Sequence, residues 1–453
     1  MSHAAATAEA DLLAAALRAA RDTRLLELER GACRRTGAAF GSLFGSATAQ
    51  VIADENTFAV AGQDAVDSLR SSGQPCVDPV VLPAKGLYAE YSFVERIRAY
   101  IAATDAIPIA VGSGAMNDLV KLASHQCDRP YLAVATAASM DGYTAYGASI
   151  TYQGSKQTFD CPAPRGVIAD LDVIATAPPW MNASGYADLA AKCPAGADWI
   201  IADALNEEPI KPDVWNTVQS RLREWMAEPA GIRRGDFETL RRTTIALMMS
   251  GFAMQAALSS RPASGAEHQF SHLWDMEHHT HDGEAPSHGF KVGVGSLASL
   301  ALYEALDEID LSKLNIEQAL ENWPTAQQNE AEIQSLFALE ELTAKAREQS
   351  SIKHISRDVL KSQLEQVKRN WPRLQQRLHE QLIPRNEFRD MLREAGAPHE
   401  SEQIGISRDR LRRSYRQAYH IRRRFTVLDL ARRTGLLEPA LDLIFQQPGG
   451  ERA

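Results

Sequence analysis

The pattern of apolar and polar positions divides the chain into two regions. Between residues 49 and 178, short apolar runs alternate with segments whose apolar residues recur at helical spacing. This alternation is typical of a parallel sheet with helices between its strands. After Pro178 and Pro179 the strand-like runs nearly vanish and the helical spacing continues. The pattern predicts an α/β domain over residues 49–178 and an all-α domain over residues 179–453, preceded by a helical extension over residues 1–48.

The same pattern predicts the individual elements. Strands are expected at residues 51–53, 80–82, 107–111, 131–135 and 166–169, and a hairpin at 148–152 and 156–159. Helices are expected at residues 8–30, 62–69, 91–102, 182–192, 213–227, 237–258, 297–309, 316–322, 333–349, 356–370 and over much of 409–433.

Two predicted strands end in turns of small and polar residues. The strand at 107–111 runs into Gly112, Ser113 and Gly114, and the strand at 131–135 runs into a polar turn over residues 136–142. Ligands of open α/β sheets bind at such strand ends, and the first N–H groups of a helix suit a pyrophosphate. A Gly-Ser-Gly turn alone is more often only a tight connection, and its spacing differs from the common dinucleotide fingerprint.

Histidines are concentrated in one stretch. Residues 264–295 contain half of the chain's 12 histidines. His268 and His272 are four residues apart, on one face of a predicted helix, and His288 follows across a polar loop. Imidazoles are common metal ligands, so the stretch is a candidate metal site that lacks its remaining ligand. His278, His279 and His281 are interpreted as solvated loop residues or as a weak adventitious metal site.

Bulk composition narrows the class of protein. The 453 residues are 45% hydrophobic and 23% charged, with a formal net charge of -10, which is typical of a globular protein of about two domains and disfavours binding to nucleic acid or anionic membranes. Five scattered cysteines, odd in number, indicate reduced thiols, and the start of the chain is a poor signal peptide, so a cytoplasmic location is expected. Residues 245–258 are too short an apolar run to span a bilayer.

Several motifs in order resemble the glycerol-1-phosphate dehydrogenase family, a branch of the superfamily of iron-containing alcohol dehydrogenases and 3-dehydroquinate synthases. The resemblance extends over most of the chain. The matching stretches are DENTFAVAG from Asp54, GSGAMNDLVK from Gly112, TAASMDGY from Thr136, GYADLAAK from Gly185, SGAEHQFSH from Ser264, SHGFKVGVG from Ser287 and RRRFTVLDLA from Arg422.

The resemblance implies an α/β N-terminal dinucleotide-binding domain and an all-α C-terminal domain, with the active site in the cleft between them. It implies NAD(P) as cofactor and one divalent metal, zinc, nickel or iron, held by Asp188, His268 and His288. His272 and Asp141 would contact substrate, with Asp188 close to both. The cofactor would be bound by Asp54, Gly112, Ser113, Gly114, Asn117, Asp118, Thr136, Ser139 and Thr144, and Asp54 would accept hydrogen bonds from the adenosine ribose.

The chain departs from the family at two positions. Ala145 stands where the family usually has a serine, with Thr144 just before it, so a cofactor contact has moved or been lost. Ala187 replaces the glycine that usually precedes the metal aspartate. The stretch 278–285 also differs from the family, and residues 330–400 carry no matching motif.

The expected activity is interconversion of dihydroxyacetone phosphate and sn-glycerol 1-phosphate, or of a related small polyol phosphate. Alternatives are a carbocycle-forming lyase similar to 3-dehydroquinate synthase, a dehydrogenase of unphosphorylated polyols, and a metal-binding or regulatory protein without catalysis. The expected partner is a small phosphorylated polyol or ketose, and assembly into a homo-oligomer is left open.

Overall fold

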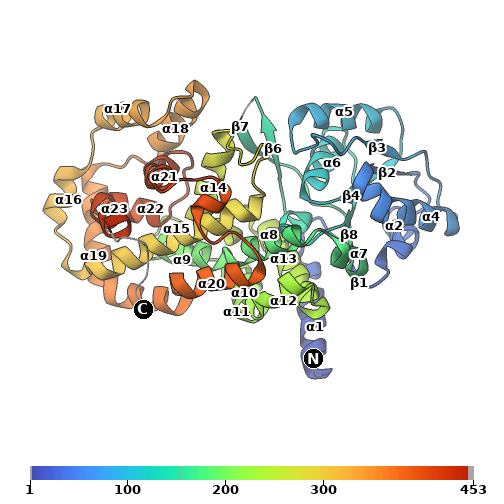
Figure 1. Cartoon of the computed structure of the whole chain (residues 1–453), viewed down its shortest axis with the longest axis horizontal. Helices are drawn as coiled ribbons and strands as arrows, with labels where there is room; N and C mark the ends of the chain where they lie inside the picture. Colours follow the sequence, from blue (N-terminus) through green and yellow to red (C-terminus); the bar gives the residue numbers. More distant parts are fainter. Residues whose placement is uncertain (1–2, 154, 447–453) are drawn as a thin grey trace. The chain divides into compact units, whose positions relative to one another are not determined.

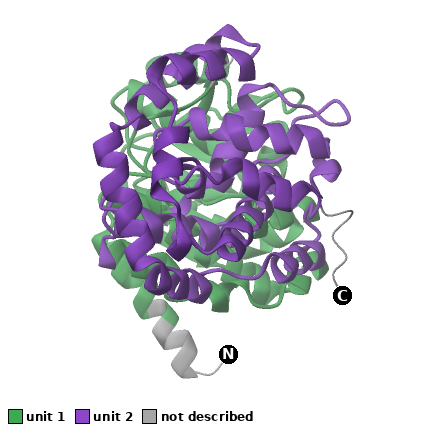
Figure 2. Ribbon diagram, turned by 90° about the vertical axis from the view of Figure 1, so that its left-hand side faces the viewer, with its two compact units in different colours: residues 1–189, 213–262 green, residues 190–212, 263–453 purple. Residues whose placement is uncertain are grey.

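The computed structural model describes residues 3–153 and 155–446, and Figure 1 shows the arrangement of its helices and strands. The chain forms two compact units (Figure 2). Unit 1 comprises Met1–Leu189 and Asp213–Pro262, and unit 2 comprises Ala190–Pro212 and Ala263–Ala453. These units differ from the predicted division at residue 178, because the helices of residues 179–189 and 213–257 group with the sheet.

Unit 1 contains a six-stranded sheet in the order β1-β8-β5-β4-β2-β3, and every pair in it is parallel. The strands are β1 (Leu25–Glu29), β2 (Ala49–Asp54), β3 (Val80–Leu82), β4 (Ile107–Gly112), β5 (Leu132–Ala135) and β8 (Gly166–Asp170). A separate hairpin is formed by β6 (Ala148–Tyr152) and β7 (Ser155–Phe159). The predicted parallel α/β architecture is confirmed.

The strand order places a topological switch point between β2 and β4. From β2 the chain passes to β3 on one side and then returns to β4 on the other side of β2. Crevices at such points, beyond the carboxyl ends of the strands, are where open α/β sheets bind their ligands. The residues that follow β2 and β4 are therefore the first place to look for a nucleotide site.

The described helices of unit 1 flank this sheet or follow it in sequence. They are α1 (His3–Ala19), α2 (Thr36–Phe44), α4 (Gln63–Ser71), α5 (Tyr91–Ala102), α6 (Gly114–Gln126), α7 (Leu171–Thr176), α8 (Pro179–Ala190), α10 (Pro212–Gln219), α11 (Leu222–Met226), α12 (Pro229–Arg234) and α13 (Phe237–Ala257), with the single-turn α3 (Glu55–Thr57). The core beneath the sheet is built from strand residues such as Val51, Ile109 and Val134, which are buried against helix residues such as Phe40 and Leu69.

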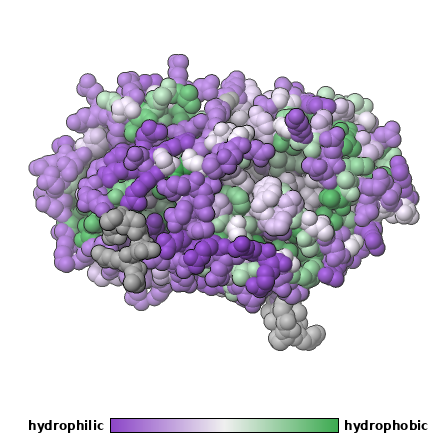
Figure 3. Space-filling view, in the orientation of Figure 1, coloured by the Kyte–Doolittle hydropathy of each residue, from purple (hydrophilic) through white to green (hydrophobic). Residues whose placement is uncertain are grey.

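All the helices and strands assigned among the described residues of unit 2 are helices, joined by loops, as predicted for the second half of the chain. Its helices are α9 (Lys192–Ala204), α14 (Ala266–Met276), α15 (His288–Ile309), α16 (Ile316–Asn322), α17 (Ala326–Leu336), α18 (Glu340–Lys353), α19 (Arg357–Gln381), α20 (Arg385–Ala395), α21 (Arg408–His420), α22 (Val427–Arg433) and α23 (Leu437–Gln446). None of the described helices is long and apolar enough to cross a membrane, and the face in Figure 3 is mostly hydrophilic with scattered apolar patches.

The structure corrects three helix predictions. The helix expected at 8–30 ends at Ala19, and Leu25–Glu29 is instead a sheet strand paired with β8, so the first 48 residues are not a purely helical extension. The helix expected at 213–227 is interrupted between α10 and α11. The helix expected at 333–349 is two helices, because Phe337 and Leu339 take extended backbone angles between α17 and α18.

Candidate active site

The predicted phosphate turn joins β4 to α6. Gly112 ends β4, Ser113 is the N-cap of α6, and Gly114 is the first residue of the helix. A Cβ on Gly112 would lie 2.5 Å from Cβ of Met116, and one on Gly114 would lie 2.9 Å from Cγ of Met140. Both positions therefore require glycine for packing, and the helix start that they form faces the carboxyl edge of the sheet, where a phosphate group can be bound.

Asp54 lies beside this turn, at the end of β2. Its Oδ1 accepts the backbone N–H groups of Asn56 (2.9 Å) and Thr57 (3.1 Å), and its Oδ2 accepts the hydroxyl of Thr57 (2.8 Å). The same hydroxyl lies 3.0 Å from the carbonyl of Val111 in β4. Asp54 is thus an N-cap that ties β2 to β4 at the switch point, and its carboxylate is already oriented before any ribose is bound.

The polar turn after β5 is anchored from both sides within unit 1. Thr136 donates its backbone N–H to the carbonyl of Gly112 (3.2 Å), and the hydroxyl of Ser184 lies 3.4 Å from the carbonyl of Ser139. A Cβ on Gly185 would overlap the carbonyl oxygen of Ala138, so α8 approaches this turn closely only because residue 185 is glycine.

Two aspartates, Asp141 and Asp188, are in contact at this turn. The backbone N–H of Asp141 donates to Oδ2 of Asp188 (3.1 Å), and Oδ2 of Asp141 accepts the hydroxyl of Ser250 (2.8 Å). Asp188 is fully buried and Asp141 is 9% exposed. The structure therefore brings Asp188 next to Asp141, as the resemblance implies, and it adds Ser250, which sequence reasoning missed.

Three residues predicted to bind the cofactor, the buried Asn117 and Thr144 and the partly buried Asp118, make structural hydrogen bonds. Asn117 accepts the hydroxyl of Tyr131 (3.1 Å), and Asp118 accepts the backbone N–H of Ser149 (3.1 Å). Thr144, which is 0% exposed, donates its hydroxyl to the carbonyl of Met248 (2.7 Å). Burial raises the pKa of Asp118, while nearby Lys121 opposes the rise. Their contacts hold the turn, and contact with the cofactor stays a prediction for all three.

Lys121 is buried beside the same turn. An isolated lysine is usually solvent-facing, but Lys121 is 1% exposed and donates to the carbonyls of Gly142 (2.9 Å), Ala145 (3.0 Å) and Gly147 (3.0 Å). The ammonium fixes the backbone after Asp141 from within unit 1.

The predicted histidines lie on α14 and α15 in unit 2. His268 and His272 are on α14, and His288 is the first residue of α15, whose N-cap Ser287 accepts the N–H of Phe290 (3.3 Å). The ring of His268 is 5.2 Å from that of His288 and 6.3 Å from that of His272, between centroids. Asp188, His268 and His288 each offer a ligand atom within 4.8 Å of the others, a spacing that suits one metal ion.

Glu267 orients the first of these ligands. Its Oε1 lies 2.8 Å from Nδ1 of His268 and also accepts the N–H of Gly265 (2.5 Å). This contact assigns the proton of His268 to Nδ1 and leaves Nε2 as the ligand atom. Burial raises the pKa of Glu267 to about 7, against the backbone N–H of Gly265 and the charges of Lys192 and Arg424. A carboxylate next to a predicted ligand was the sequence signal for this residue.

His272 has a different environment. It is partly exposed, and desolvation followed by the charge of Arg422 lowers the pKa of its imidazole well below the ordinary value. The ring is therefore neutral at physiological pH. A neutral imidazole can accept a proton at one nitrogen and release one from the other, as a relay requires.

The interpretation of His279 as a solvated loop residue is wrong. His279 is 8% exposed, with Nε2 2.6 Å from the carbonyl of Ile404 and Nδ1 2.7 Å from Nη1 of Arg410. The arginine donates to Nδ1, so Nε2 carries the proton. His278 is exposed, as expected.

Comparisons with known proteins match this chain to one group of dehydrogenases. Residues 27–178 match the family model described as iron-containing alcohol dehydrogenase. The chain is 37% identical over 258 residues to the glycerol-1-phosphate dehydrogenase [NAD(P)+] of Halalkalibacterium halodurans, a match that covers 56% of this chain and 64% of that enzyme. It is 28% identical to the Bacillus subtilis enzyme of the same name, over 83% of both chains. The Methanococcoides burtonii enzyme is 34% identical, over 56% of this chain and 69% of its own.

Solved structures extend the likeness of fold. Glycerol dehydrogenase from Schizosaccharomyces pombe aligns with a TM-score of 0.59 at 16% identity, over 95% of this chain and 92% of that one. A sulfoacetaldehyde reductase from Bifidobacterium kashiwanohense, solved in complex with NAD+, has a TM-score of 0.59 at 12% identity, over 95% and 98%. These structures show the likeness of fold. The relatives above, among them the Methanococcoides burtonii enzyme at 34% identity over 69% of its length, identify the chain as a member of the glycerol-1-phosphate dehydrogenase family, within the iron-containing alcohol dehydrogenase superfamily.

Proposed function

We propose that this chain is an NAD(P)-dependent, metal-assisted dehydrogenase that interconverts dihydroxyacetone phosphate and sn-glycerol 1-phosphate. The observation that carries the proposal is the ligand set of Asp188, His268 and His288, gathered in a chain whose relatives are glycerol-1-phosphate dehydrogenases. The match covers 64% of the Halalkalibacterium halodurans enzyme and 83% of the Bacillus subtilis enzyme.

The donor set fits a divalent metal. One carboxylate and two imidazoles with ligand atoms within 4.8 Å suit zinc, nickel and ferrous iron. Bound there, the metal would act as a Lewis acid on the substrate oxygen. Glu267 supports this assignment because it holds His268 in the tautomer that presents Nε2.

The chain's own residues supply the remaining roles. The start of α6 at Gly112 to Gly114 would hold the cofactor phosphates, and Asp54 would accept hydrogen bonds from the adenosine ribose and disfavour a 2′-phosphate. His272 would relay the proton between substrate oxygen and solvent, because its imidazole is neutral at physiological pH. Asp141, held by Ser250, would position the substrate hydroxyls.

The other candidate activities have less support. The 3-dehydroquinate synthases resemble one another in having a glutamate as the first metal ligand. This chain has Asp188 at that position, which disfavours the lyase. A dehydrogenase of unphosphorylated polyols differs only in the substrate, so it is the alternative that an experiment must separate. The glycerol-1-phosphate dehydrogenases among the relatives favour the phosphorylated substrate.

A substrate panel tests the proposal. Protein reconstituted with zinc, nickel or iron is assayed with NADH and NADPH against dihydroxyacetone phosphate, dihydroxyacetone and glycerol. The phosphorylated ketose is expected to be reduced most efficiently, and His268→Ala is expected to lose the activity together with bound metal. His278→Asn is the matched control, because His278 is exposed and asparagine tolerates its positive φ of 51°. Turnover of only unphosphorylated polyols would contradict the proposed substrate.

A further inference from the structure

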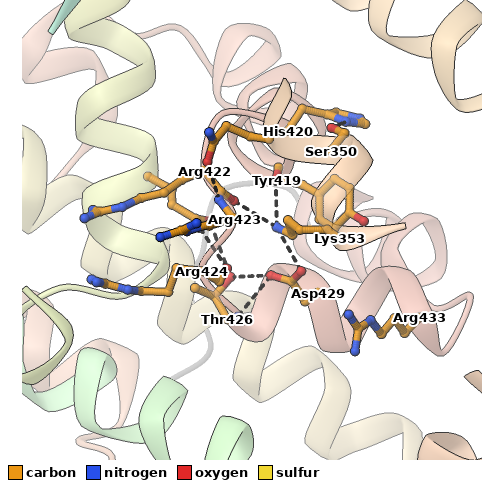
Figure 4. Close-up of polar contacts among 12 residues, drawn as sticks. Ser350, Lys353, Tyr419, His420, Arg422, Arg423, Arg424, Thr426, Asp429 and Arg433 are labelled. Atoms are coloured by element: carbon orange, nitrogen blue, oxygen red, sulfur yellow. Dashed lines mark hydrogen bonds and ion pairs between the residues drawn. The ribbon is translucent and has the colours of Figure 1, made fainter. Parts of the chain in front are cut away.

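Three consecutive arginines lie on an extended segment of unit 2 between α21 and α22. Residues 422–426 have no helical conformation. Successive side chains of an extended backbone point to opposite sides, and the exposures follow this alternation, since Arg422 and Arg424 are partly buried while Arg423 is exposed. Arg422 and Arg424 extend away from Asp429 in Figure 4.

Arg422 and Arg424 converge on one residue. Nη1 of Arg422 lies 3.2 Å from Oγ of Ser264, and Nη1 of Arg424 lies 2.8 Å from the carbonyl oxygen of Ser264. Ser264 precedes α14, the helix that carries His268 and His272. The two guanidinium groups are thereby placed at the start of the helix that bears the predicted metal ligand.

The backbone of the segment is fixed by buried charges. Nζ of Lys353 donates to the carbonyls of Tyr419 (2.8 Å) and Arg422 (3.2 Å) and pairs with Asp429 (2.8 Å), as Figure 4 shows. Oδ2 of Asp429 accepts the N–H of Thr426 (3.0 Å). Both ends of the segment are therefore held before any ligand arrives, which lowers the ordering cost of binding one.

The two arginines bring positive charge to the start of the helix that carries His268 and His272. Both charges would attract a dianion bound at this place. Guanidinium groups match the geometry of a phosphate group.

We propose that Arg422 and Arg424 bind the phosphoryl group of the substrate and thereby select a phosphorylated ketose over its unphosphorylated analogue. This inference rests on the proposed function, which it deepens. The same chemistry would suit a phosphate of the cofactor. We assign the substrate because both arginines contact Ser264, just before α14, the helix that carries His272 and the predicted metal ligand His268.

The variants Arg422→Gln and Arg424→Gln test the inference, with Arg423→Gln as matched control because Arg423 is exposed, whereas its two neighbours are partly buried. The KM for dihydroxyacetone phosphate is expected to rise at least about tenfold in the first two, since a lost hydrogen bond to a charged group corresponds to about tenfold or more in affinity. The KM for NADH and the metal content are expected to stay unchanged, while the kcat/KM for dihydroxyacetone is expected to fall by a smaller factor than that for the phosphorylated ketose. Arg422→Lys, which keeps the charge but not the planar fork, is expected to be intermediate.

Inorganic phosphate gives a readout without catalysis. It is expected to raise the melting temperature of the metal-loaded wild type and of Arg423→Gln, but not of the other two glutamine variants. Equal phosphate stabilisation in all variants would overturn the inference, and so would a rise in the KM for NADH in place of the ketose. A wild type that binds phosphate but does not reduce dihydroxyacetone phosphate would contradict the proposed function alone. A wild type that does neither would contradict both.

Discussion

At the scale of single residues, Glu267 is the contact that sequence reasoning did not assign. Because its Oε1 is 2.8 Å from Nδ1 of His268, replacing it by glutamine keeps the shape but removes the negative charge behind the ligand. Partners of this kind typically account for 10- to 100-fold in metal affinity. Glu267→Gln is therefore expected to weaken zinc binding by about tenfold or more, measured by competition with a chromogenic chelator.

The control for this change is Glu277→Gln, at the end of the same helix. Glu277 pairs with Arg410 at 2.7 Å and caps the end of α14, whereas His268 lies at the start of this helix, so its loss is expected to leave zinc affinity unchanged. Equal affinities of Glu267→Gln and wild type would show that Glu267 only fills space.

A substitution at Thr144 distinguishes a structural role of its hydroxyl from a role in cofactor binding. Its hydroxyl is buried and donates to Met248, so Thr144→Val, which is close in shape, is expected to destabilise the fold by about 1 kcal/mol. The KM for NADH is expected to stay within about twofold of wild type, because the hydroxyl points into the core. Chemical denaturation and steady-state kinetics on one preparation check both parts. A large rise in the KM for NADH at unchanged stability would restore the cofactor contact.

At the scale of elements, α14 and α15 approach closely because residue 295 is glycine. A Cβ there would lie 2.5 Å from the backbone oxygen of Glu267, so Gly295→Ala forces the helices apart. Overpacking of this kind costs about 1–3 kcal/mol. Since His268 and His288 lie on these two helices, metal affinity is expected to fall along with the melting temperature of the apoprotein. A normal metal affinity in a destabilised Gly295→Ala protein would mean that the pair tolerates the shift.

The elements also show what the sequence could and could not predict. β3 and α5 were predicted at their observed bounds, since Val80–Leu82 and Tyr91–Ala102 carry clear local patterns. β1 was missed because its five residues gain their strand form from pairing with β8, more than a hundred residues away. The start of α17 had a local signal that went unread, the capping box of Thr325 and Gln328.

The candidate site, too, could be predicted from the sequence only in part. The motifs predicted which residues come together, and Asp188, His268 and His288 do. They did not predict the side-chain partners. Ser250 acts through a tertiary contact that no spacing encodes, and the carboxylate of Glu267 directly before His268 was a local signal that went unread. Polar residues of a motif can equally bind the backbone, as Asn117 and Lys121 do at the carbonyl of Gly142. A pattern of residues along the sequence does not distinguish this use from binding of a ligand.

At the scale of the whole molecule, net charge says little about where charges are placed. The chain carries 58 acidic and 48 basic residues, which favours a solvated acidic surface. Unit 2 nevertheless buries Lys353 with Asp429, at 3% and 1% side-chain exposure. Such a pair contributes specificity more reliably than stability, while breaking it leaves one charge uncompensated. The buried charges of unit 2 make its folding sensitive to pH.

The protonation of His420 determines whether stability rises or falls as the pH is lowered. It closes α21, where its Nδ1 lies 2.6 Å from Oγ of Ser350 in α18 and its Nε2 lies 3.8 Å from Glu332 in α17. Burial lowers the pKa of His420 to about 4, well below its ordinary value. Despite burial, hydrogen bonds from Arg432 and the nearby imidazole of His420 hold the pKa of Glu332 below its ordinary value. Both groups resist protonation in the folded state more than in the unfolded chain.

Stability is therefore expected to fall on acidification. Between pH 6.5 and 4 the unfolded chain binds more protons at His420 than the folded chain does, so this group removes up to about 1.4 kcal/mol of stability per pH unit across that window. His420→Gln retains a hydrogen-bonding side chain without a titrating group. Its free energy of unfolding is expected to decline less steeply than that of the wild type from pH 6.5 to 4.5, in denaturant titrations at constant ionic strength. Parallel curves for the two proteins across this window would show that His420 is not the group that makes unit 2 acid-sensitive.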